Sequence, residues 1–388
     1  MEEYFSTTLN KLKSNNYSNL TIVLGNESCD LDSAVTSIVY AIFLHWQHNR
    51  IKCKVCTASK RSEECSDDIF ISVLDVNRED FGLKTEVVFC LQEHGITEKD
   101  LVFSDDINME KLVAEGKTKI VLVDHHVLAK KYEYLAPYVT EIIDHRPLDR
   151  SQWTYSEDTR STIEVVGSCC TLIAQRIRDL SALIAKEVDF YTDHPACTQL
   201  LYSVILLDTV NFSKEVNKAT KHDEEIVAFL EHLLKIDQCE TERKLRVDRL
   251  LAARSDVSSL SAAQLLRKDL KIFGHILVPS FPILVKDFLQ KPNAVEAVSE
   301  ALSSRGCALA LLLGMELKVT LQRDATVISS VEQELAEDLA KFLQKWSSPS
   351  LQLISVPEVH CFYFKQMNLS ASRKQYVPAL NEFLNICK

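Results

Sequence analysis

Short apolar runs alternate with helical patterns through the first half of the chain. Apolar positions spaced three and four residues apart predict helices over residues 33–48, 109–115, 168–183 and 197–207. The apolar runs between them, which we expect to form strands, are residues 20–24, 51–56, 87–91, 101–103, 120–123 and 141–143. Continuous apolar strands separated by helices are typical of a doubly wound α/β fold with a mainly parallel sheet.

The pattern changes after residue 212, where the charged segment SKEVNKATKHDEE precedes an amphipathic helix. We expect a linker helix at residues 215–237 between a first domain of residues 1–214 and a second of residues 238–388. Two domains also agree with a length of 388 residues. A smaller α/β domain is predicted by strand candidates that lie between helices at residues 272–278, 308–313, 317–321 and 359–363.

Composition and charge narrow the class of protein. The chain is 46% hydrophobic and 26% charged, as in globular proteins, and its formal charge of −11 argues against binding to nucleic acid or to an acidic membrane surface. The start, MEEYFSTTLNKLKSNN, lacks a signal pattern, and no apolar run has the length of a membrane span. We therefore expect a cytoplasmic protein, with or without a nuclear pool, that does not bind membranes.

The 12 cysteines fit reduced thiols in a large chain of this kind. Cys53 and Cys56 form a CxxC pair on an apparent strand. Because no second pair has matching spacing, we interpret them as packing residues and not as zinc ligands.

Acidic and histidine side chains follow the ends of several apolar runs. Each alone is more typical of a helix cap or a turn. Together they would meet at one edge of a parallel sheet, where ligands bind. Carboxylates and imidazole suit Mg²⁺ or Mn²⁺, and two adjacent ions would explain why so many acids converge. These residues are Asp30 and Asp32, Asp105, Asp124 with His125 and His126, Asp144 with His145 and Arg146, and Asp208.

The ordered motifs CDLDS, VDHHV, IDHRP, VGSCCT and LLDTVNF resemble those of the DHH phosphoesterase superfamily. They are most similar to the branch of family II inorganic pyrophosphatases and short-chain exopolyphosphatases, and GNESCDLDS with DHR is most similar to its prune-type proteins. The resemblance extends over nearly the whole chain. It implies a DHH catalytic domain, a DHH-associated substrate-binding domain, and an active site in the cleft.

The resemblance also implies the ligands of two Mg²⁺ or Mn²⁺ ions. Asp30 and Asp32 match acids that bind different ions of the pair, and Asp105 matches the acid that bridges both. His125 and Asp208 match the remaining ligands. In the pyrophosphatases a water molecule attacks the phosphoanhydride at such a site, and these five residues are therefore the expected catalytic set.

The neighbours of these ligands have other implied roles. Asp124 matches a residue that supports the adjacent imidazole. His126, His145 and Arg146 match positions facing the substrate phosphates. The pyrophosphatases usually have His where this chain has Asn26, and an amide oxygen is a weaker and harder ligand. We therefore expect Asn26 to be a weak metal ligand that favours Mg²⁺ and lowers catalytic efficiency.

Two basic stretches of the second domain match substrate-binding segments of the family. SAAQLLRKDLKIF contributes Lys271, and SASRKQYVPAL contributes Arg373 and Lys374. Lysine and arginine suit the several negative charges of a phosphoanhydride. Ser168, which opens a helix near the metal edge, is either a plain helix cap or a phosphate contact.

The expected activity is metal-dependent hydrolysis of phosphoanhydrides, with release of terminal phosphate from short polyphosphates. The chain lacks the GGGH-type run of the nuclease relatives, which again argues against nucleic acid. One alternative is a cyclic-nucleotide phosphodiesterase. Another is a regulatory protein-binding module with weak or decayed activity, since prune-type proteins are associated with partners such as nucleoside diphosphate kinase. The chain continues only to NICK after the last motif, so we expect no long polar tail for such binding.

Overall fold

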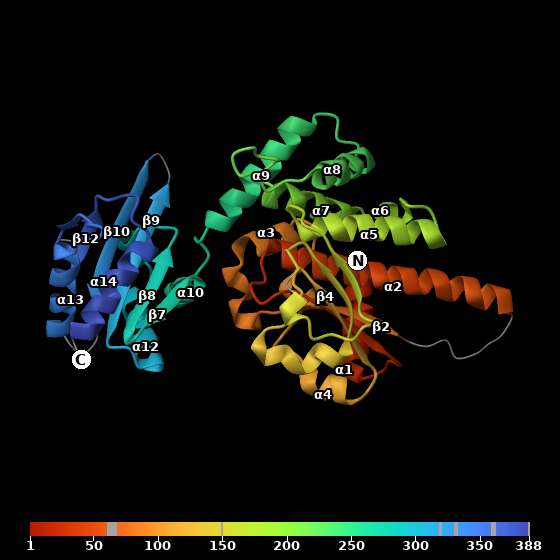
Figure 1. Ribbon diagram of the computed structural model, residues 1–388, viewed down its shortest axis with the longest axis horizontal. Helices are drawn as coiled ribbons and strands as arrows, with labels where there is room; N and C mark the ends of the chain where they lie inside the picture. Colours follow the sequence, from red (N-terminus) through yellow and green to blue (C-terminus); the bar gives the residue numbers. More distant parts are fainter. Residues whose placement is uncertain (60–67, 149, 318–319, 330–332, 358–361, 387–388) are drawn as a thin grey trace. The chain divides into compact units, whose positions relative to one another are not determined.

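The computed structural model describes residues 1–59, 68–148, 150–317, 320–329, 333–357 and 362–386 (Figure 1). Chain contacts divide it into a first unit, Met1–Arg254, and a second unit, Ser255–Lys388. The division falls at the last residue of helix α9 (Cys239–Ser255), later than the expected start of the second domain at residue 238. Helix α8 (Lys221–Leu234), expected in a linker, packs instead on α7 inside the first unit.

The first unit contains a six-stranded sheet in the order β3-β2-β1-β4-β5-β6, and every neighbouring pair is parallel. Its strands are β1 (Leu20–Leu24), β2 (Ile69–Leu74), β3 (Val102–Phe103), β4 (Thr118–Val123), β5 (Val139–Asp144) and β6 (Arg160–Ile163). This confirms the doubly wound parallel sheet. The strand order reverses between β1 and β4, and in such sheets ligands bind beside the carboxyl ends of the strands at the reversal.

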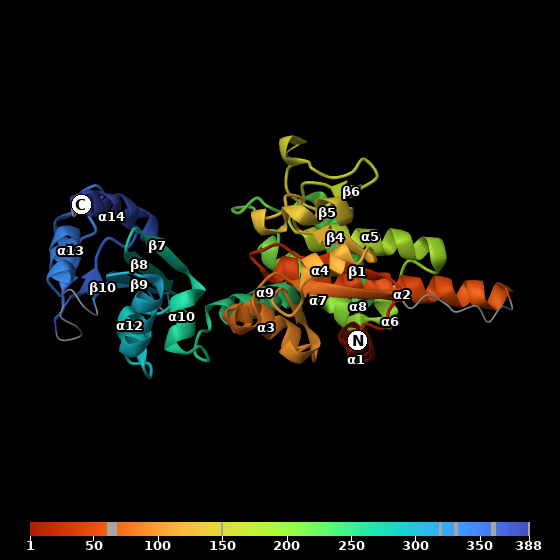
Figure 2. The same ribbon diagram turned by 90° about the horizontal axis from the view of Figure 1, so that it is seen from below.

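Helices cover both faces of this sheet, which explains why its central strands β1 and β4 are mostly apolar and bury side chains on both faces (Figures 1 and 2). In β1, Ile22 contributes to the core under one layer and Val23 to the core under the other. The first layer contains α1 (Glu2–Ser14), α4 (Met109–Ala114) and the 3-10 segment η3 (Lys130–Tyr138). The second contains α2 (Leu31–Ser59), α5 (Cys169–Ile184) and α7 (Pro195–Asp208).

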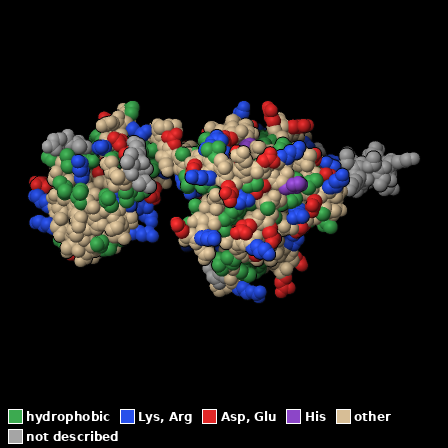
Figure 3. Space-filling view, turned by 90° about the horizontal axis from the view of Figure 1, so that it is seen from above, with side chains coloured by type: hydrophobic (Ala, Val, Ile, Leu, Met, Phe, Trp, Pro, Cys, Tyr) green, Lys and Arg blue, Asp and Glu red, His purple; other side chains and the backbone are tan. Residues whose placement is uncertain are grey.

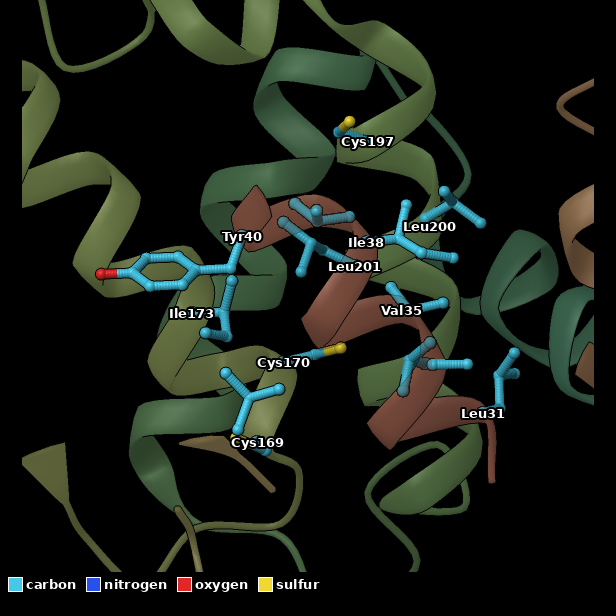
Figure 4. Packing of buried hydrophobic residues seen from close by; sticks show 14 of the residues in the cluster. Leu31, Val35, Ile38, Tyr40, Cys169, Cys170, Ile173, Cys197, Leu200 and Leu201 are labelled. Atoms are coloured by element: carbon cyan, nitrogen blue, oxygen red, sulfur yellow. The ribbon is translucent and has the colours of Figure 1, made fainter. Parts of the chain in front are cut away.

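The second layer packs on the sheet through a large cluster of buried aromatic and aliphatic side chains. Tyr40 of α2 lies among α2, α5 and α7 with Ile173 and Leu201 (Figure 4). Cys169 and Cys170 point into the same core, and the structure records them as free thiols. The described cysteines therefore fit the expected reduced, mostly buried thiols.

Two of the expected strands are helices. Residues 51–59 continue α2, so that Cys53 and Cys56 lie on a helix, and residues 87–91 lie in α3 (Thr85–Gln92). A short apolar run has no periodicity that separates a buried strand from a buried helix. The strand after α2 is β2, which the hydrophobic pattern did not single out.

The second unit contains a mixed sheet in the order β11-β12-β10-β9-β8-β7, in which only the β8–β9 pair is parallel among the described strands. Its strands are β7 (Leu270–Phe273), β8 (Ile276–Phe281), β9 (Leu309–Leu317), β10 (Leu321–Ile328), β11 (Leu353–Ser355) and β12 (Tyr363–Gln366). Of the expected strand at residues 317–321, Leu317 ends β9, Leu321 begins β10, and residues 318–319 lie outside the described residues. Most of the expected strand at residues 359–363 also lies outside them.

The helices of the second unit are α10 (Ala262–Lys268), α11 (Val285–Leu289), α12 (Ala294–Arg305), α13 (Gln333–Lys345) and α14 (Arg373–Ile386). A buried acid links one helix to the sheet. Asp324 of β10 accepts hydrogen bonds from the backbone N–H groups of Val285 and Lys286 and from the Tyr363 hydroxyl. It thereby satisfies donors at the start of α11 that have no partner within the helix.

None of the helices in the described part of the chain is both long and apolar enough to cross a membrane. Figure 3 shows acidic and basic side chains interspersed over the displayed surface of the first unit.

Candidate metal centre

The candidate site lies at the reversal of strand order, where the loops after β1, β4 and β5 come together. Gly25 ends β1 without a side chain, and a Cβ at this position would overlap Ser33. The Ser33 hydroxyl accepts a hydrogen bond from the Asn26 N–H at 2.7 Å, which folds the loop back onto α2. Two loop residues other than glycine have positive φ, Cys29 at 43° and Asp124 at 61°. Such backbone strain is typical of functional sites.

Asp32 connects the first turn of α2 to the start of α5. Its carboxylate is 4% exposed and accepts hydrogen bonds from the Ser168 hydroxyl at 2.9 Å and from the N–H groups of Cys169 and Cys170 at 2.7 and 2.9 Å. The positive end of the α5 dipole stabilises this buried anion. Ser168 is therefore a helix cap that also positions an acid of the site.

Asp124 is the buried acid at the end of β4. Its Oδ2 atom accepts a hydrogen bond from Asn26 Nδ2 at 2.6 Å. Its buried Oδ1 atom has no hydrogen bond of regular geometry within the described residues, although His145 Nε2 lies 3.3 Å away. Burial, reinforced by the negative charge of Asp32, raises the pKa of Asp124. An orphaned carboxylate oxygen with a raised pKa is what a cation would satisfy.

His145 completes this group from the loop after β5. Its Nδ1 atom lies 2.9 Å from the Val166 carbonyl, which fixes Nδ1 as the protonated nitrogen. In the neutral tautomer Nε2 then carries the lone pair, as a metal-binding imidazole requires. Burial lowers the pKa of His145, but hydrogen bonding to Asp124 and the charge of Asp32 outweigh it and raise the pKa overall. Without a metal, His145 therefore acts as the countercharge of the two acids.

Together these three side chains can hold a cation. One ligand atom from each of Asp32, Asp124 and His145 lies within 4.8 Å of the others. Two carboxylate oxygens and one imidazole nitrogen are a hard donor set that fits a divalent cation such as Mg²⁺ or Mn²⁺. The resemblance implied that Asp124 supports the adjacent imidazole and that His145 faces the substrate phosphates. The geometry instead places both residues beside Asp32.

The histidines of the DHH motif are held by their Nδ1 atoms. His125 Nδ1 lies 2.9 Å from the Val123 carbonyl, and burial lowers the pKa of this imidazole. The neutral ring therefore has its lone pair on Nε2. His126 Nδ1 pairs with the fully buried Asp144, which also accepts the His145 N–H at 2.8 Å. Asp144 thus orients two histidines at once, a role that the sequence did not assign to it.

Three further expected ligands, Asp208, Asp30 and Asp105, have different surroundings. Asp208 ends helix α7, and burial together with the adjacent Asp32 raises its pKa well above the usual value. Asp30 accepts hydrogen bonds from the Ser33 N–H at 3.1 Å and the Ser28 hydroxyl at 3.1 Å. Asp105 is exposed, and its Oδ1 accepts the Arg78 N–H at 3.0 Å. Because β3 is the edge strand, the structure does not bring Asp105 into the group of three.

Asn26 lies in the site with both ends of its amide engaged. Oδ1 accepts hydrogen bonds from the Ser28 N–H at 2.9 Å and the Ser28 hydroxyl at 2.6 Å, while Nδ2 faces Asp124. In this orientation Asn26 holds the Asp124 carboxylate in place. Its expected role as a weak ligand stays a prediction.

Sequence analysis missed one acid at the same edge of the sheet. Asp75 follows β2, is 5% exposed, and binds Lys131 Nζ at 2.7 Å and the Tyr132 hydroxyl at 2.8 Å. The signal that could have found it, an apolar run ending in Asp, is present in FISVLD. It was missed because residues 69–74 were not predicted to form a strand.

The basic residues expected to bind substrate differ in their exposure. Arg146 is half exposed, with its guanidinium 4.0 Å from Asp124. In the second unit, Lys271 and Lys374 are exposed. Arg373 is instead engaged, because it donates to the carbonyl of Asp269 at 2.7 Å and that of Val278 at 3.3 Å and pairs with the Asp269 carboxylate at 2.6 Å. Val278 pairs with Lys271 across the β7–β8 hairpin, so Arg373 fixes the strand that carries Lys271.

Comparison with known proteins agrees with this arrangement. Residues 248–383 match the family model described as DHHA2 domain. Exopolyphosphatase PRUNE1 of Rattus norvegicus is 32% identical over 376 residues, covering 94% of this chain and 76% of that protein. Exopolyphosphatase PRUNE1 of Homo sapiens is 29% identical over the same shares of the two chains. A "probable manganese-dependent inorganic pyrophosphatase" of Deinococcus radiodurans is 28% identical over 40% of this chain and 45% of that protein.

The similarity to PRUNE1 of Rattus norvegicus extends across both units and covers more than two thirds of that protein. The ordered motifs, the parallel sheet and the DHHA2 match all agree with it. The chain therefore belongs to the prune-type exopolyphosphatase family of DHH phosphoesterases.

Proposed function

We propose that this protein is a metal-dependent hydrolase of phosphoanhydride bonds that releases terminal phosphate from short-chain polyphosphates. Relatives that match 94% of the chain are named exopolyphosphatases, and a further relative is named a pyrophosphatase. The single observation that carries the proposal is the group of Asp32, Asp124 and His145 at the reversal of the sheet, with one buried carboxylate oxygen left without a regular hydrogen bond.

The cofactor we propose is a pair of Mg²⁺ or Mn²⁺ ions. Asp32, Asp124 and His145 would hold one ion. The residues proposed to complete the sites are Asp30, Asp105, His125 and Asp208, with Asn26 as a weak ligand. When bound, such ions lower the pKa of a water molecule and neutralise charge on the phosphoryl group.

The chain's own residues orient and neutralise the substrate. Asp144 fixes the orientation of the His126 ring through Nδ1, and His126 is proposed to face a substrate phosphate. The half-exposed Arg146 lies beside the acids and suits a phosphate through its planar fork. In the second unit, the exposed Lys271 and Lys374 are proposed to bind further phosphates as point charges, with Arg373 supporting them.

The test is phosphate release from pyrophosphate, tripolyphosphate, a longer polyphosphate and cyclic AMP, each with Mg²⁺ or Mn²⁺. Wild-type protein is compared with Asp32→Asn and with Glu157→Gln, which removes the same charge at an exposed loop position. We expect the fastest release from tripolyphosphate, its loss in Asp32→Asn, and no change in Glu157→Gln.

Other outcomes would contradict the proposal in different ways. Hydrolysis of cyclic AMP alone would favour the phosphodiesterase alternative. No release from any substrate by well-folded protein, with either metal, would favour the regulatory binding module and a protein partner such as nucleoside diphosphate kinase. Release that survives Asp32→Asn would show that the site is elsewhere.

A further inference from the structure

The first unit has a second pocket, between α1 and α4, that shares no residue with the candidate metal centre. Its volume is about 590 Å³. The apolar part of its lining, here called the floor, includes Leu101 and Val102 at the start of the edge strand β3. Partly exposed side chains of the same core, Leu12 of α1 and Leu112 of α4, form its sides. A concave site of this size, with an apolar floor, is typical of a small-molecule site.

Cationic side chains surround this apolar floor. Lys13 comes from the end of α1, Lys99 from the 3-10 segment η2 (Glu98–Asp100), and Lys111 from α4. All three are exposed, and none forms an ion pair with any residue in the described ranges. The pocket has two more cationic than anionic lining side chains in a chain whose formal charge is −11. This local excess favours an anion.

In one wall of the pocket, the charges of Arg78 and Asp106 neutralise each other. Arg78 binds both carboxylate oxygens of Asp106 at 3.0 and 2.6 Å, and its guanidinium lies 4.4 Å from the ring centroid of Phe103. Arg78 also donates to the carbonyls of Glu98 at 3.0 Å and Leu101 at 3.2 Å. The positive charges left for a ligand are therefore those of the three lysines.

Polar and aromatic groups in the same pocket suit a nucleobase. Tyr17 offers a partly exposed ring on which a flat base can stack. Asn108 caps α4 by accepting the Lys111 N–H at 2.9 Å with Oδ1, so that its NH₂ group remains directed to other partners. Asn15 adds a second side-chain amide. An inorganic polyphosphate could use the lysines, but it would gain nothing from the floor, the ring or the amides.

We propose that this pocket binds a nucleoside polyphosphate, with the base over the apolar floor beside Tyr17 and the phosphates between Lys13, Lys99 and Lys111. The site is separate from the proposed catalytic one. It would give the protein a place to sense nucleotides whatever the substrate of the metal centre is.

The test is calorimetric titration of the whole protein with ATP in the presence of EDTA, which leaves the candidate metal centre without ions. Adenosine and tripolyphosphate are titrated in parallel, each of which lacks one half of the ligand. The variants are Lys13→Ala and Lys111→Ala, with Lys186→Ala as a control that removes an exposed lysine outside the pocket. Asp32→Asn reports on binding at the candidate metal centre.

We expect ATP to bind with a stoichiometry of one, and adenosine and tripolyphosphate each to bind at least tenfold more weakly. Each pocket variant should weaken ATP binding about tenfold, the loss typical of one charge-assisted contact. Lys186→Ala and Asp32→Asn should bind ATP like the wild type. Phosphate release by Lys13→Ala and Lys111→Ala should be unchanged, which keeps this test independent of the proposed function.

Three results would overturn the proposal. The first is the absence of ATP binding to folded wild-type protein. The second is ATP binding that is unaffected by Lys13→Ala and Lys111→Ala. The third is binding of tripolyphosphate as tight as that of ATP, which would show that the apolar floor takes no part.

Discussion

His145 Nε2 lies 3.3 Å from the buried Oδ1 atom of Asp124 and 3.9 Å from Oδ2 of Asp32. One imidazole therefore compensates two acids from different parts of the chain, Asp32 in the first turn of α2 and Asp124 directly after β4. A divalent cation would take over this compensation, because it brings two positive charges to the point where both carboxylates meet.

The first prediction concerns metal binding and stability. Adding Mn²⁺ or Mg²⁺ to EDTA-treated protein should raise the melting temperature, because an ion at 100 times its Kd stabilises the folded state by about 2.7 kcal/mol. Asp124→Asn should abolish this increase, since it removes a ligand charge. Glu157→Gln should retain it. Equal metal-dependent shifts in Asp124→Asn and wild-type protein, measured by differential scanning fluorimetry, would rule out this centre.

The second prediction separates Asp105 from the group of three. Asp105→Asn keeps an oxygen that can accept the Arg78 N–H, so its free energy of unfolding should stay within about 0.5 kcal/mol of the wild type. Its rate of phosphate release should still fall at least about 100-fold if Asp105 binds the second ion. Full activity in this variant, together with loss of activity in Asp124→Asn, would remove Asp105 from the ligand set and leave the other assignments intact.

The third prediction distinguishes two basic residues of the second unit. Arg373 contacts two carbonyls and the Asp269 carboxylate, so Arg373→Ala should lower the free energy of unfolding by about 2 kcal/mol. Lys374 is exposed, so Lys374→Ala should leave stability unchanged and raise KM for tripolyphosphate. Denaturant unfolding and steady-state kinetics check both. An unchanged KM in Lys374→Ala would exclude this lysine from substrate binding.

The fourth prediction concerns the buried carboxylate of Glu141. This side chain is 1% exposed and binds Arg176 at 2.6 Å, Arg160 at 3.0 Å and the Tyr40 hydroxyl at 3.0 Å. Glu141→Gln should destabilise the protein by roughly 3 kcal/mol, because it leaves the Arg176 guanidinium without its countercharge. Arg160→Ala, at a side chain that is 65% exposed, should cost no more than about 1 kcal/mol in urea unfolding. Equal losses in both variants would contradict this distinction.

The fifth prediction gives a pH dependence of stability. Burial lowers the pKa of His194 from 6.5 to about 4, with His45 and the amino group of Met1 acting in the same direction and Asp193 opposing them. Because the pKa of His194 is lower in the folded state than in the unfolded state, protonation favours unfolding. The contribution of the neutral imidazole to stability is therefore complete above pH 6.5 and is lost as the pH falls towards 4. In urea unfolding, His194→Asn should flatten the decline between pH 6.5 and 4. The control is His232→Asn, which changes an exposed histidine. If the stability of His194→Asn declines as steeply over this pH range as that of His232→Asn, the prediction is wrong.

The sequence determined the fold class and most of the chemistry. Apolar runs such as residues 20–24 and 120–123, each followed by a loop rich in acids, predict a parallel sheet with a polar edge, because strands buried on both faces must be continuously apolar. The ordered motifs identify the family. These features are local in the chain, and the sequence therefore carries them without any knowledge of which segments meet.

The tertiary structure decided which acids are neighbours. All the candidate acids except Asp208 follow strands, but only β1 and β4 flank the reversal of strand order, with β5 next to β4, whereas β3 lies at the edge. Strands are about 4.8 Å apart, and β3 lies three positions from β4 and four from β5, so Asp105 is out of reach of a cation held by Asp124 and His145. Strand order, together with the hydrogen bonds of Val166 and Asn26, therefore selected Asp32, Asp124 and His145 from a longer series of candidates.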